Sequence, residues 1–201
     1  MQHSSRLADY TNKQTNMPLP YLYQSPRIGF RKWTKEDEPI FHKMCNDPVV
    51  MEYLPAFWSM GKVQTRLALI NQEIDEYGHG FFAVDELATG KFMGFIGIKY
   101  EKKLPPWSPM IEIGWRLDTP FWGKGYATEG AKATLKFGFE TIGIDTIYAI
   151  APQVNRKSIR IMEKTGMKYL QKFQHPLLSA ESKLKTCELW KIERKEFNQK
   201  A

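Results

Sequence analysis

The hydrophobic positions of this chain follow two periodicities, one typical of strands and one typical of helices, which together predict a mixed α and β domain. Seven runs have the alternation, or the β-branched and aromatic content, that is typical of strands. They lie at residues 27–33, 81–85, 92–100, 110–117, 146–151, 167–173 and 185–193. Four segments with hydrophobic residues at helical spacing lie between them, beginning after Thr34, after Ser59, at Thr128 and at Ser158. The order β-α-α-β-β-β-α-β-α-β-β favours an α/β or α+β sheet of about seven strands with helices on both faces.

Local signals set the expected ends of these elements. The sequence 34–37, Thr-Lys-Glu-Asp, resembles a capping box and predicts Thr34 as the N-cap of the first helix. Ser59 is the expected N-cap of the second helix, and the sequence Tyr-Gly-His-Gly at 77–80 closes it. Residues 1–26 are polar and proline-containing, with little periodicity, which predicts a loose N-terminal arm before a single domain at 27–201.

A glycine-spaced loop stands out after the strand at 110–117. Residues 122–127 read Trp-Gly-Lys-Gly-Tyr-Ala and run directly into the helix expected from Thr128. A helix N-terminus presents unpaired backbone N–H groups at the positive end of its dipole, which favours an anion such as phosphate. Gly123 and Gly125 permit a positive φ and a close approach of a ligand to the backbone.

The loop alone leaves several interpretations open. A P-loop is excluded, because the string G-x-x-x-x-G-K-[ST] does not occur in the chain. The interpretation as a dinucleotide-binding loop, G-x-G-x-x-G, is weakened because Thr128 stands at the third glycine position. Asp145 nevertheless has the spacing expected of the acid that binds ribose in such proteins. A phosphate loop of another class, and a tight turn that binds nothing, stay open at this point.

Composition indicates a soluble protein with one core. The 201 residues are 42% hydrophobic and 25% charged, which is ordinary for a globular domain. No apolar run reaches the roughly 18 residues of a membrane span, and no apolar signal region opens the chain, so we expect a cytoplasmic protein without a membrane partner. Cys45 and Cys187 lack a C-x-x-C or histidine partner, which predicts reduced packing residues and no metal site.

The net charge of +7 is concentrated at the two ends of the chain. Residues 1–35 carry +5, residues 36–155 carry −5 and residues 156–201 carry +7. Basic ends can attract nucleic acid or a polyphosphate ligand. No basic and aromatic nucleic-acid motif occurs, so we expect no specific nucleic-acid partner.

Several strings together resemble the GNAT superfamily of acyl-CoA N-acyltransferases. They are Glu-Ile-Gly-Trp at 112–115, Trp-Gly-Lys-Gly-Tyr-Ala-Thr-Glu at 122–129, Asn-Arg-Lys-Ser at 155–158 and Glu-Lys-Thr-Gly-Met at 163–167. The resemblance covers about residues 27–194, and it is closest to the branch that acetylates the N-termini of ribosomal proteins. It implies a mostly antiparallel, twisted sheet in which a central parallel pair, 110–117 and 146–151, splays apart.

The resemblance also implies acetyl-CoA as co-substrate, with its pantetheine arm in the splay and its pyrophosphate on the amides of 123–127. Asn155 is then a hydrogen-bond partner of the pantetheine, or alternatively only the cap of the helix that follows. The residues that the resemblance assigns to cofactor binding are Trp115, Arg116, Leu117, Trp122, Gly123, Lys124, Gly125, Tyr126, Ala127, Thr128, Asn155, Ser158 and Met162. No metal is implied.

The implied reaction is direct attack of an amine on the thioester through a tetrahedral intermediate. A backbone N–H near Trp115 or Arg116 would stabilise the oxyanion. Glu112 is the candidate base, acting through water, or else an exposed strand acid. Ser158 is the candidate that orients or protonates the sulfur, or else an ordinary first-turn helix residue. Met162 stands where many relatives have a tyrosine acid, and Pro120 replaces their Arg or Gln.

The expected acceptor is a primary amine, either a protein N-terminus or a small molecule, and the chain is a monomer or a homodimer. Residues expected near the acceptor are Tyr53, Trp58, His79, Trp107 and His175, although a core or surface role is commoner for such side chains. The missing tyrosine keeps an alternative open, a non-catalytic protein that binds or senses acyl-CoA.

Overall fold

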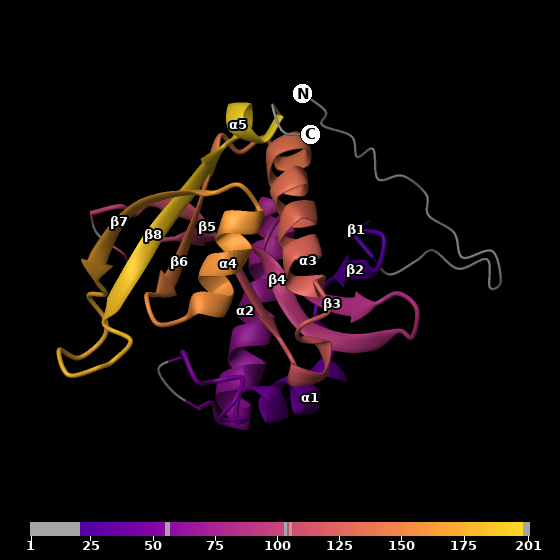
Figure 1. Ribbon diagram of the computed structural model, residues 1–201. Coiled ribbons are helices and arrows are strands. Elements are labelled where there is room, and N and C mark those ends of the chain that lie inside the picture. The colour runs from indigo at the N-terminus through magenta and orange to yellow at the C-terminus, as the bar shows by residue number, and fades with distance from the viewer. Residues whose placement is uncertain (1–20, 55–56, 103, 105, 199–201) are drawn as a thin grey trace.

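The sheet of this protein consists of eight strands in the order β1-β2-β3-β4-β5-β6-β8-β7 (Figure 1). The computed structural model describes residues 21–54, 57–102, 104 and 106–198. The strands are β1 (Tyr23–Gln24), β2 (Ile28–Arg31), β3 (Phe81–Glu86), β4 (Lys91–Glu101), β5 (Met110–Leu117), β6 (Thr146–Pro152), β7 (Lys168–Gln174) and β8 (Thr186–Glu193). Neighbours pair antiparallel, except β5 and β6, which are parallel. The mixed, mostly antiparallel sheet is confirmed.

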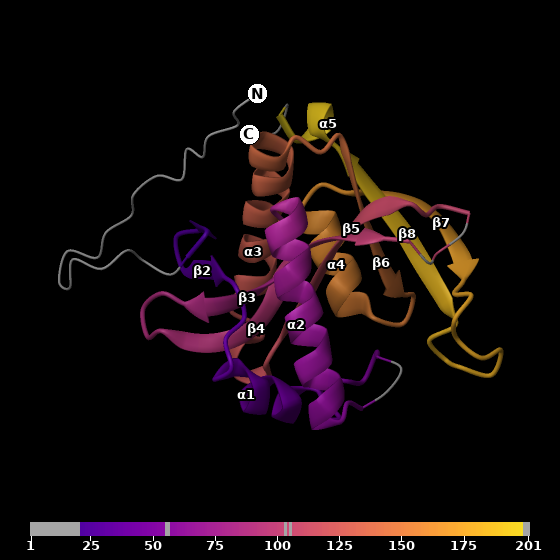
Figure 2. The ribbon, with the colours of Figure 1, turned by 180° about the vertical axis from the view of Figure 1, so that it is seen from behind.

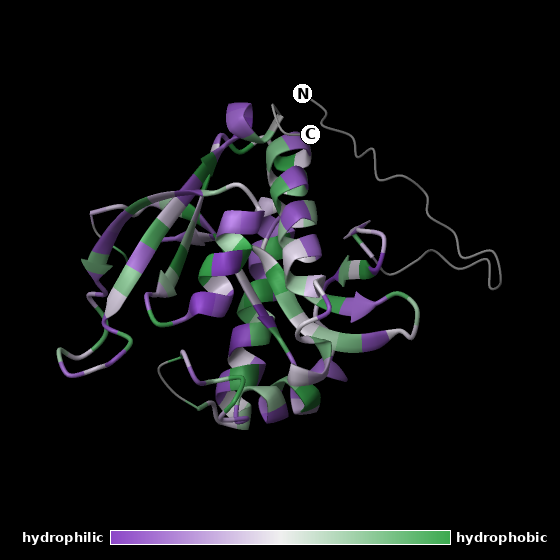
Figure 3. Ribbon diagram, in the orientation of Figure 1, coloured by the Kyte–Doolittle hydropathy of each residue, from purple (hydrophilic) through white to green (hydrophobic). Residues whose placement is uncertain are grey.

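Helices cover both faces of this sheet. They are α1 (Asp37–Met44), α2 (Met60–Tyr77), the short η1 (Thr119–Phe121), α3 (Tyr126–Lys136), the π-helical continuation η2 (Phe137–Ile142), α4 (Arg156–Lys164) and α5 (Arg194–Asn198). The helices α3 and α4 lie on one face, and α2 crosses the other (Figures 1 and 2). Hydrophobic and hydrophilic bands alternate along α2 and α3, as expected for helices with one face on a core (Figure 3).

The alternation of side chains along β5 assigns its residues to these two faces. Ile113 packs in the core beneath α3 and α4, where Leu135, Ile147 and Met162 are also buried. Arg116 lies opposite Phe95 of β4, on the face that α1 and α2 cover. Because successive side chains of a strand point to opposite faces, Glu112 shares the face of Arg116.

The sheet includes residues that the sequence placed in the N-terminal arm. Tyr23 of β1 pairs with Phe30, stacks on its ring at 4.1 Å and stacks on Phe137 at 4.3 Å. A two-residue strand is too short to leave a periodic pattern, so the sequence predicted only seven strands. The rest of the predicted arm, residues 1–20, lies outside the described residues, and the division into arm and domain stays a prediction.

Three helix starts differ from the prediction. Thr34 is not the N-cap of α1, since Glu36 occupies that position and makes no side-chain cap. Asp37 instead accepts a hydrogen bond from the backbone N–H of Thr34 at 2.8 Å. The helices α3 and α4 each begin two residues before the predicted starts at Thr128 and Ser158. Ser59 does cap α2, as predicted, and the helix ends within the predicted segment 77–80, at Gly78 with a positive φ of 72°.

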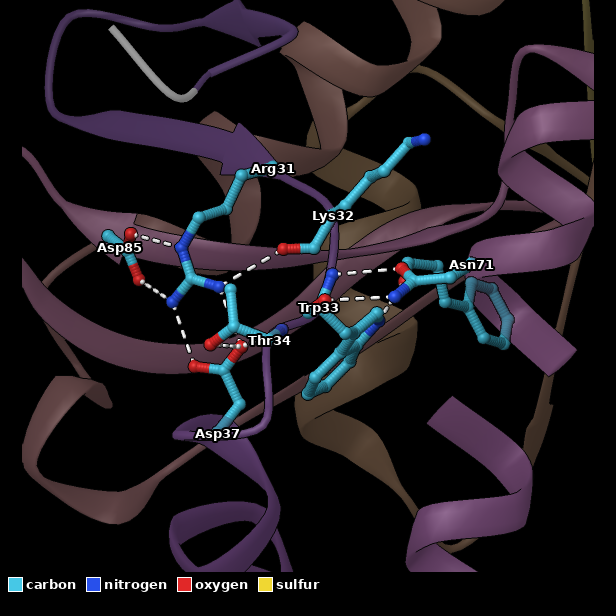
Figure 4. A network of polar contacts seen from close by, with 8 residues as sticks. Arg31, Lys32, Trp33, Thr34, Asp37, Asn71 and Asp85 are labelled. Carbon is cyan, nitrogen blue, oxygen red and sulfur yellow. Dashed lines mark hydrogen bonds and ion pairs between the residues drawn. The ribbon is translucent and has the colours of Figure 1, made fainter. Parts of the chain in front are cut away.

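A buried polar network joins β2, β3 and α1 (Figure 4). The guanidinium of Arg31 donates to both carboxylate oxygens of Asp37, at 2.6 and 2.8 Å, and to both of Asp85, at 2.6 and 2.8 Å. Asn71 of α2 bonds the backbone of Trp33 in both directions, at 2.9 and 2.8 Å. The network fixes the helices on the face of the sheet that carries Glu112 and Arg116.

Candidate active site

The centre of the sheet opens between β5 and β6. The two strands share a single paired position, Glu112 with Tyr148, whereas β4 and β5 pair at eight positions and β6 and β8 at seven. Backbone groups beyond that point have no strand partner across the gap, and unpaired backbone groups are costly unless something satisfies them. The predicted splay is therefore confirmed, and it leaves an opening of the kind that an extended, amide-containing arm can fill.

The glycine loop lies at the carboxyl end of β5, where α3 begins. Gly123 and Gly125 have positive φ values of 74° and 83°, as predicted, and both are exposed. Among the described residues, no acceptor takes the backbone N–H groups of Tyr126, Ala127 or Thr128. These donors point out of the first turn of α3 at the positive end of its dipole. The loop is therefore built to receive an anion.

A cation that was not predicted from the sequence supports this loop. Arg27 donates to the backbone carbonyl of Lys124 at 3.2 Å, pairs with Glu129 at 2.6 Å and lies 4.3 Å over the ring of Tyr126. Burial alone would raise the pKa of Glu129, but the hydrogen bonds from Ser25 and Arg27 lower it, so the carboxylate stays charged. Arg27 is 102 residues from Glu129 in sequence, and no local pattern marks such a pair.

The flank of the loop is held by Trp122 and contacted by α4. The indole Nε1 of Trp122 donates to the carbonyl of Leu117 at 2.7 Å, which closes the turn between β5 and the loop. The ammonium of Lys157 in α4 lies 4.5 Å over the same indole ring. These contacts place a cation of α4 beside the loop, in which Lys124 is itself exposed.

The start of α4 faces β5 across the splay. Asn155 caps α4, since its side-chain oxygen accepts from the N–H of Ser158 at 3.1 Å. The hydroxyl of Ser158 accepts from the indole Nε1 of Trp115 at 3.3 Å. Met162 is only 1% exposed and packs in the core, so its predicted contact with a cofactor stays a prediction. The structure thus brings Trp115, Asn155 and Ser158 together at one end of the opening.

Glu112 lies at the other end of the opening, in a small charged cluster. Lys99 of β4 contacts Glu112 at 3.2 Å and Glu101 at 2.6 Å. The side chain of Glu112 is only 18% exposed, and burial raises its pKa even though the charge of Lys99 opposes the shift. A carboxyl group with a raised pKa is a better proton acceptor than an exposed one. The alternative of a plain exposed strand acid does not describe this residue.

A cleft of about 1310 Å³ runs along the α2 face of the sheet, beside Glu101 and Lys99. Trp58 and His79 line it, whereas Tyr53, Trp107 and His175 do not, and a role of these residues near the acceptor stays a prediction. Burial lowers the pKa of His79, which favours the neutral imidazole. Within the described part of the chain, no group of three or more metal-ligating side chains occurs, and no helix is long and apolar enough to cross a membrane.

Comparison with known proteins decides between the interpretations of the loop. The family model described as an acetyltransferase (GNAT) domain matches residues 27–168, more than half of the chain. This chain belongs to the GNAT acetyltransferase family. The match begins at Arg27 beside the glycine loop and includes both splayed strands and α4.

Individual GNAT relatives agree with this assignment. The uncharacterized N-acetyltransferase YnaD of Bacillus subtilis (strain 168) is 40% identical over 145 residues, 71% of this chain and 79% of that protein. The crystal structure of a GNAT-family acetyltransferase from Bacillus anthracis has a TM-score of 0.72 at 26% identity, covering 86% of this chain and 98% of that one. A spermidine N-acetyltransferase from Vibrio cholerae, solved with CoA and spermine, has a TM-score of 0.68 at 16% identity, with coverages of 86% and 98%.

Family membership settles the coarse chemistry. The protein is an acetyl-CoA-dependent N-acetyltransferase, and acetyl-CoA is its co-substrate. The dinucleotide interpretation of the loop is therefore wrong, and the enzyme is favoured over the sensor. The more specific branch that acetylates ribosomal proteins stays a prediction, because structural likeness at low identity reports the fold alone.

Proposed function

We propose that the protein transfers the acetyl group of acetyl-CoA to a primary amine, of a protein N-terminus or of a small molecule, by direct attack. The observation that carries this proposal is Glu112, a mostly buried carboxylate with a raised pKa at the only paired position of the splayed strands. A base at that point can take a proton from an amine that approaches the opening. Acetyl-CoA supplies the activated thioester for this step.

The amides of the glycine loop fit the pyrophosphate of acetyl-CoA. Three N–H groups at the start of α3 that no described residue accepts from, with Lys124, Arg27 and Lys157 nearby, give a positive site without a bound metal. Gly125 matters because its φ of 83° is a conformation that side chains rarely adopt, and an added Cβ would lie 3.5 Å from Nη2 of Arg27. We assign the phosphate-binding role to residues 123–128 on this basis.

Asn155 can cap α4 and bind the pantetheine arm at the same time. Its side-chain oxygen is occupied by the N–H of Ser158, but its Nδ2 donates to no described residue. The free group is therefore a donor, which matches a carbonyl oxygen of the arm. The two interpretations of Asn155 from the sequence are compatible, because they use different atoms.

Ser158 is positioned to act on the sulfur side of the reaction. Its oxygen accepts from Trp115, so its own hydroxyl hydrogen remains available to donate. We propose that Ser158 orients or protonates the leaving thiolate, and that a backbone N–H near Trp115 or Arg116 stabilises charge that develops on the acyl oxygen. Glu112 and Ser158 then lie on opposite sides of the reacting centre, one taking a proton and one giving a proton.

Release of free thiol tests the proposed function directly. The purified chain is incubated with acetyl-CoA and a panel of N-terminal peptides, amino acids and small amines, and free CoA is measured between about pH 6 and 9, where amines begin to lose their proton. We expect thiol release above the hydrolysis rate with at least one amine, and an acetylated amine by mass spectrometry. Tight binding of acetyl-CoA without turnover on any amine would contradict the proposal.

A further inference from the structure

Arg116 is a buried cation at the floor of the cleft. It lies on β5 opposite Phe95, and its guanidinium carbon is 5.4 Å from the ring centre of Phe95, 5.5 Å from that of Trp58 and 5.8 Å from that of Phe41. Burial lowers the pKa of Arg116, and an arginine still remains charged. Three aromatic rings therefore surround a positively charged group that is largely buried.

The polar contacts of this guanidinium are incomplete. Its Nη1 donates to the sulfur of Cys45 at 3.1 Å, and its buried Nε has no hydrogen-bond partner among the described residues. Burial raises the pKa of the Cys45 thiol, so the sulfur is neutral and a weak acceptor. No carboxylate of the described residues lies within ion-pair distance of Arg116. The charge has no counter-ion within this part of the chain.

A buried, unpaired charge is costly, and cation–π contacts offset only part of that cost. The group that best completes a guanidinium is a carboxylate, because the planar fork of N–H donors matches two carboxylate oxygens. Arg116 lines the cleft, so a small molecule can reach it. The geometry is that of a binding site for an anion that enters from solvent.

We propose that Arg116 binds a carboxylate group of the acetyl acceptor, so that the acceptor is an amino acid or a similar amino-carboxylate. The inference rests on the proposed function and deepens it. Glu112 and Arg116 share one face of β5 at four residues' separation, about 13 Å along a strand. Gly114 lies between them, and the ring of Phe81 occupies the space over it, 2.9 Å from an added Cβ. A carboxylate on Arg116 would therefore lie beside Phe81, on the face of β5 that also carries Glu112.

Matched acceptors test this assignment. Glycine, β-alanine and γ-aminobutyrate are compared, each with its carboxamide, which keeps the amine and removes the negative charge. We expect kcat/KM for the acid to be at least tenfold higher than for the amide. The difference should arise from a lower KM for the acid and not from a change in kcat. In Arg116→Gln this ratio falls toward one. In Arg116→Lys, which keeps a charge but loses the fork, the ratio is intermediate.

Arg66→Gln is the matched control, because Arg66 lines the same cleft but already has Glu73 at 3.4 Å. This variant is expected to keep the preference for the acid. Equal kcat/KM values for acid and amide in the wild type, or an unchanged ratio in folded Arg116→Gln, would overturn the inference. So would a lower melting temperature of Arg116→Gln as its sole effect, since this would show that the arginine is structural.

A binding measurement separates this inference from the proposed function. Butyrate carries the carboxylate but no amine, and butyramide is its neutral control. We expect butyrate, and not butyramide, to raise the melting temperature of the wild type and of Arg66→Gln, with no shift in Arg116→Gln. If no amine is acetylated but butyrate still binds through Arg116, the proposed function fails and the anion site stands. If amines are acetylated and butyrate has no effect, this inference fails alone.

Discussion

Two buried arginines of this protein lie in opposite situations. Arg31 makes hydrogen bonds to two aspartates, with 13% of its side chain exposed, and these bonds involve every nitrogen of its guanidinium (Figure 4). Arg116 has a thiol, three aromatic rings and a buried Nε for which the described part of the chain offers no partner. The first site is closed by the chain itself, and the second is open to a ligand. A charged group whose partners all come from the chain stabilises the fold. A charged group that lacks such partners marks a place where a bound ligand can supply them.

The same contrast separates the two sides of β5. Its pairing with β4 is continuous over eight positions, while its pairing with β6 stops after one. The first interface stabilises the sheet and the second leaves room for the co-substrate. Substitutions in closed regions are expected to change stability, and substitutions in open regions are expected to change binding or turnover.

The largest expected effect belongs to the closed network. Arg31→Met leaves Asp37 and Asp85 buried without their shared cation, and the free energy of unfolding is expected to fall by about 3–5 kcal/mol. Urea unfolding followed by circular dichroism measures this change. Arg66→Met is the control, because its ion pair with Glu73 is partly exposed and is worth at most about 1 kcal/mol. Equal losses in the two variants would remove the distinction between closed and exposed pairs.

Gly125→Glu is expected to abolish acetyl-CoA binding, with at least a 100-fold loss of affinity, equivalent to about 2.7 kcal/mol. The new carboxylate would sit beside the amides of α3 and repel the phosphates. Calorimetric titration with acetyl-CoA measures the effect. Gly143→Glu is the matched control, since Gly143 has the same φ of 83° beyond the far end of the helix and open space around it. Similar melting temperatures with unchanged affinity in both would exclude the loop from the site.

Glu112→Gln is expected to lower kcat by about 100-fold, the usual contribution of a general base, with little change in the dissociation constant of acetyl-CoA. The amide keeps the shape of the side chain but cannot take a proton. Glu101→Gln removes the other carboxylate on Lys99 while leaving Glu112 in place, and a smaller effect is expected there. Turnover of Glu112→Gln at the wild-type rate would make this residue structural.

The smallest expected effect is a displaced pH profile. Burial raises the pKa of Glu112, so the base becomes protonated at a higher pH than an ordinary glutamate, whose pKa is about 4.3. The value of kcat/KM therefore falls as the pH drops through this raised pKa and recovers above it. A weakly basic amine keeps titration of the acceptor out of the measured range. An acidic limb at the ordinary glutamate value, or one that persists in Glu112→Gln, would contradict the assignment.

The sequence by itself determined most elements and the glycine loop, because these depend on local signals. The spacing of Val63 and Leu67 predicts α2, and Ser59 and Gly78 set its ends. Gly123 and Gly125 predict the positive φ values that the structure contains. The start of α1 was predicted wrongly: the helix begins at Asp37, whose side chain accepts from the N–H of Thr34 and pairs with Arg31.

Only the tertiary structure decided how charges are paired and which are left unpaired. The register of β4 on β5 places Lys99 beside Glu112. The fold also brings together Arg27 and Glu129, which are 102 residues apart in sequence. The unpaired state of Arg116 is likewise invisible in sequence, since an arginine on a strand is ordinarily solvated. Local propensity acts over a few residues, whereas burial and pairing depend on the whole packing of the sheet. Most helices and strands could thus be predicted from the sequence. The contacts between charged side chains of different elements depend on the tertiary structure.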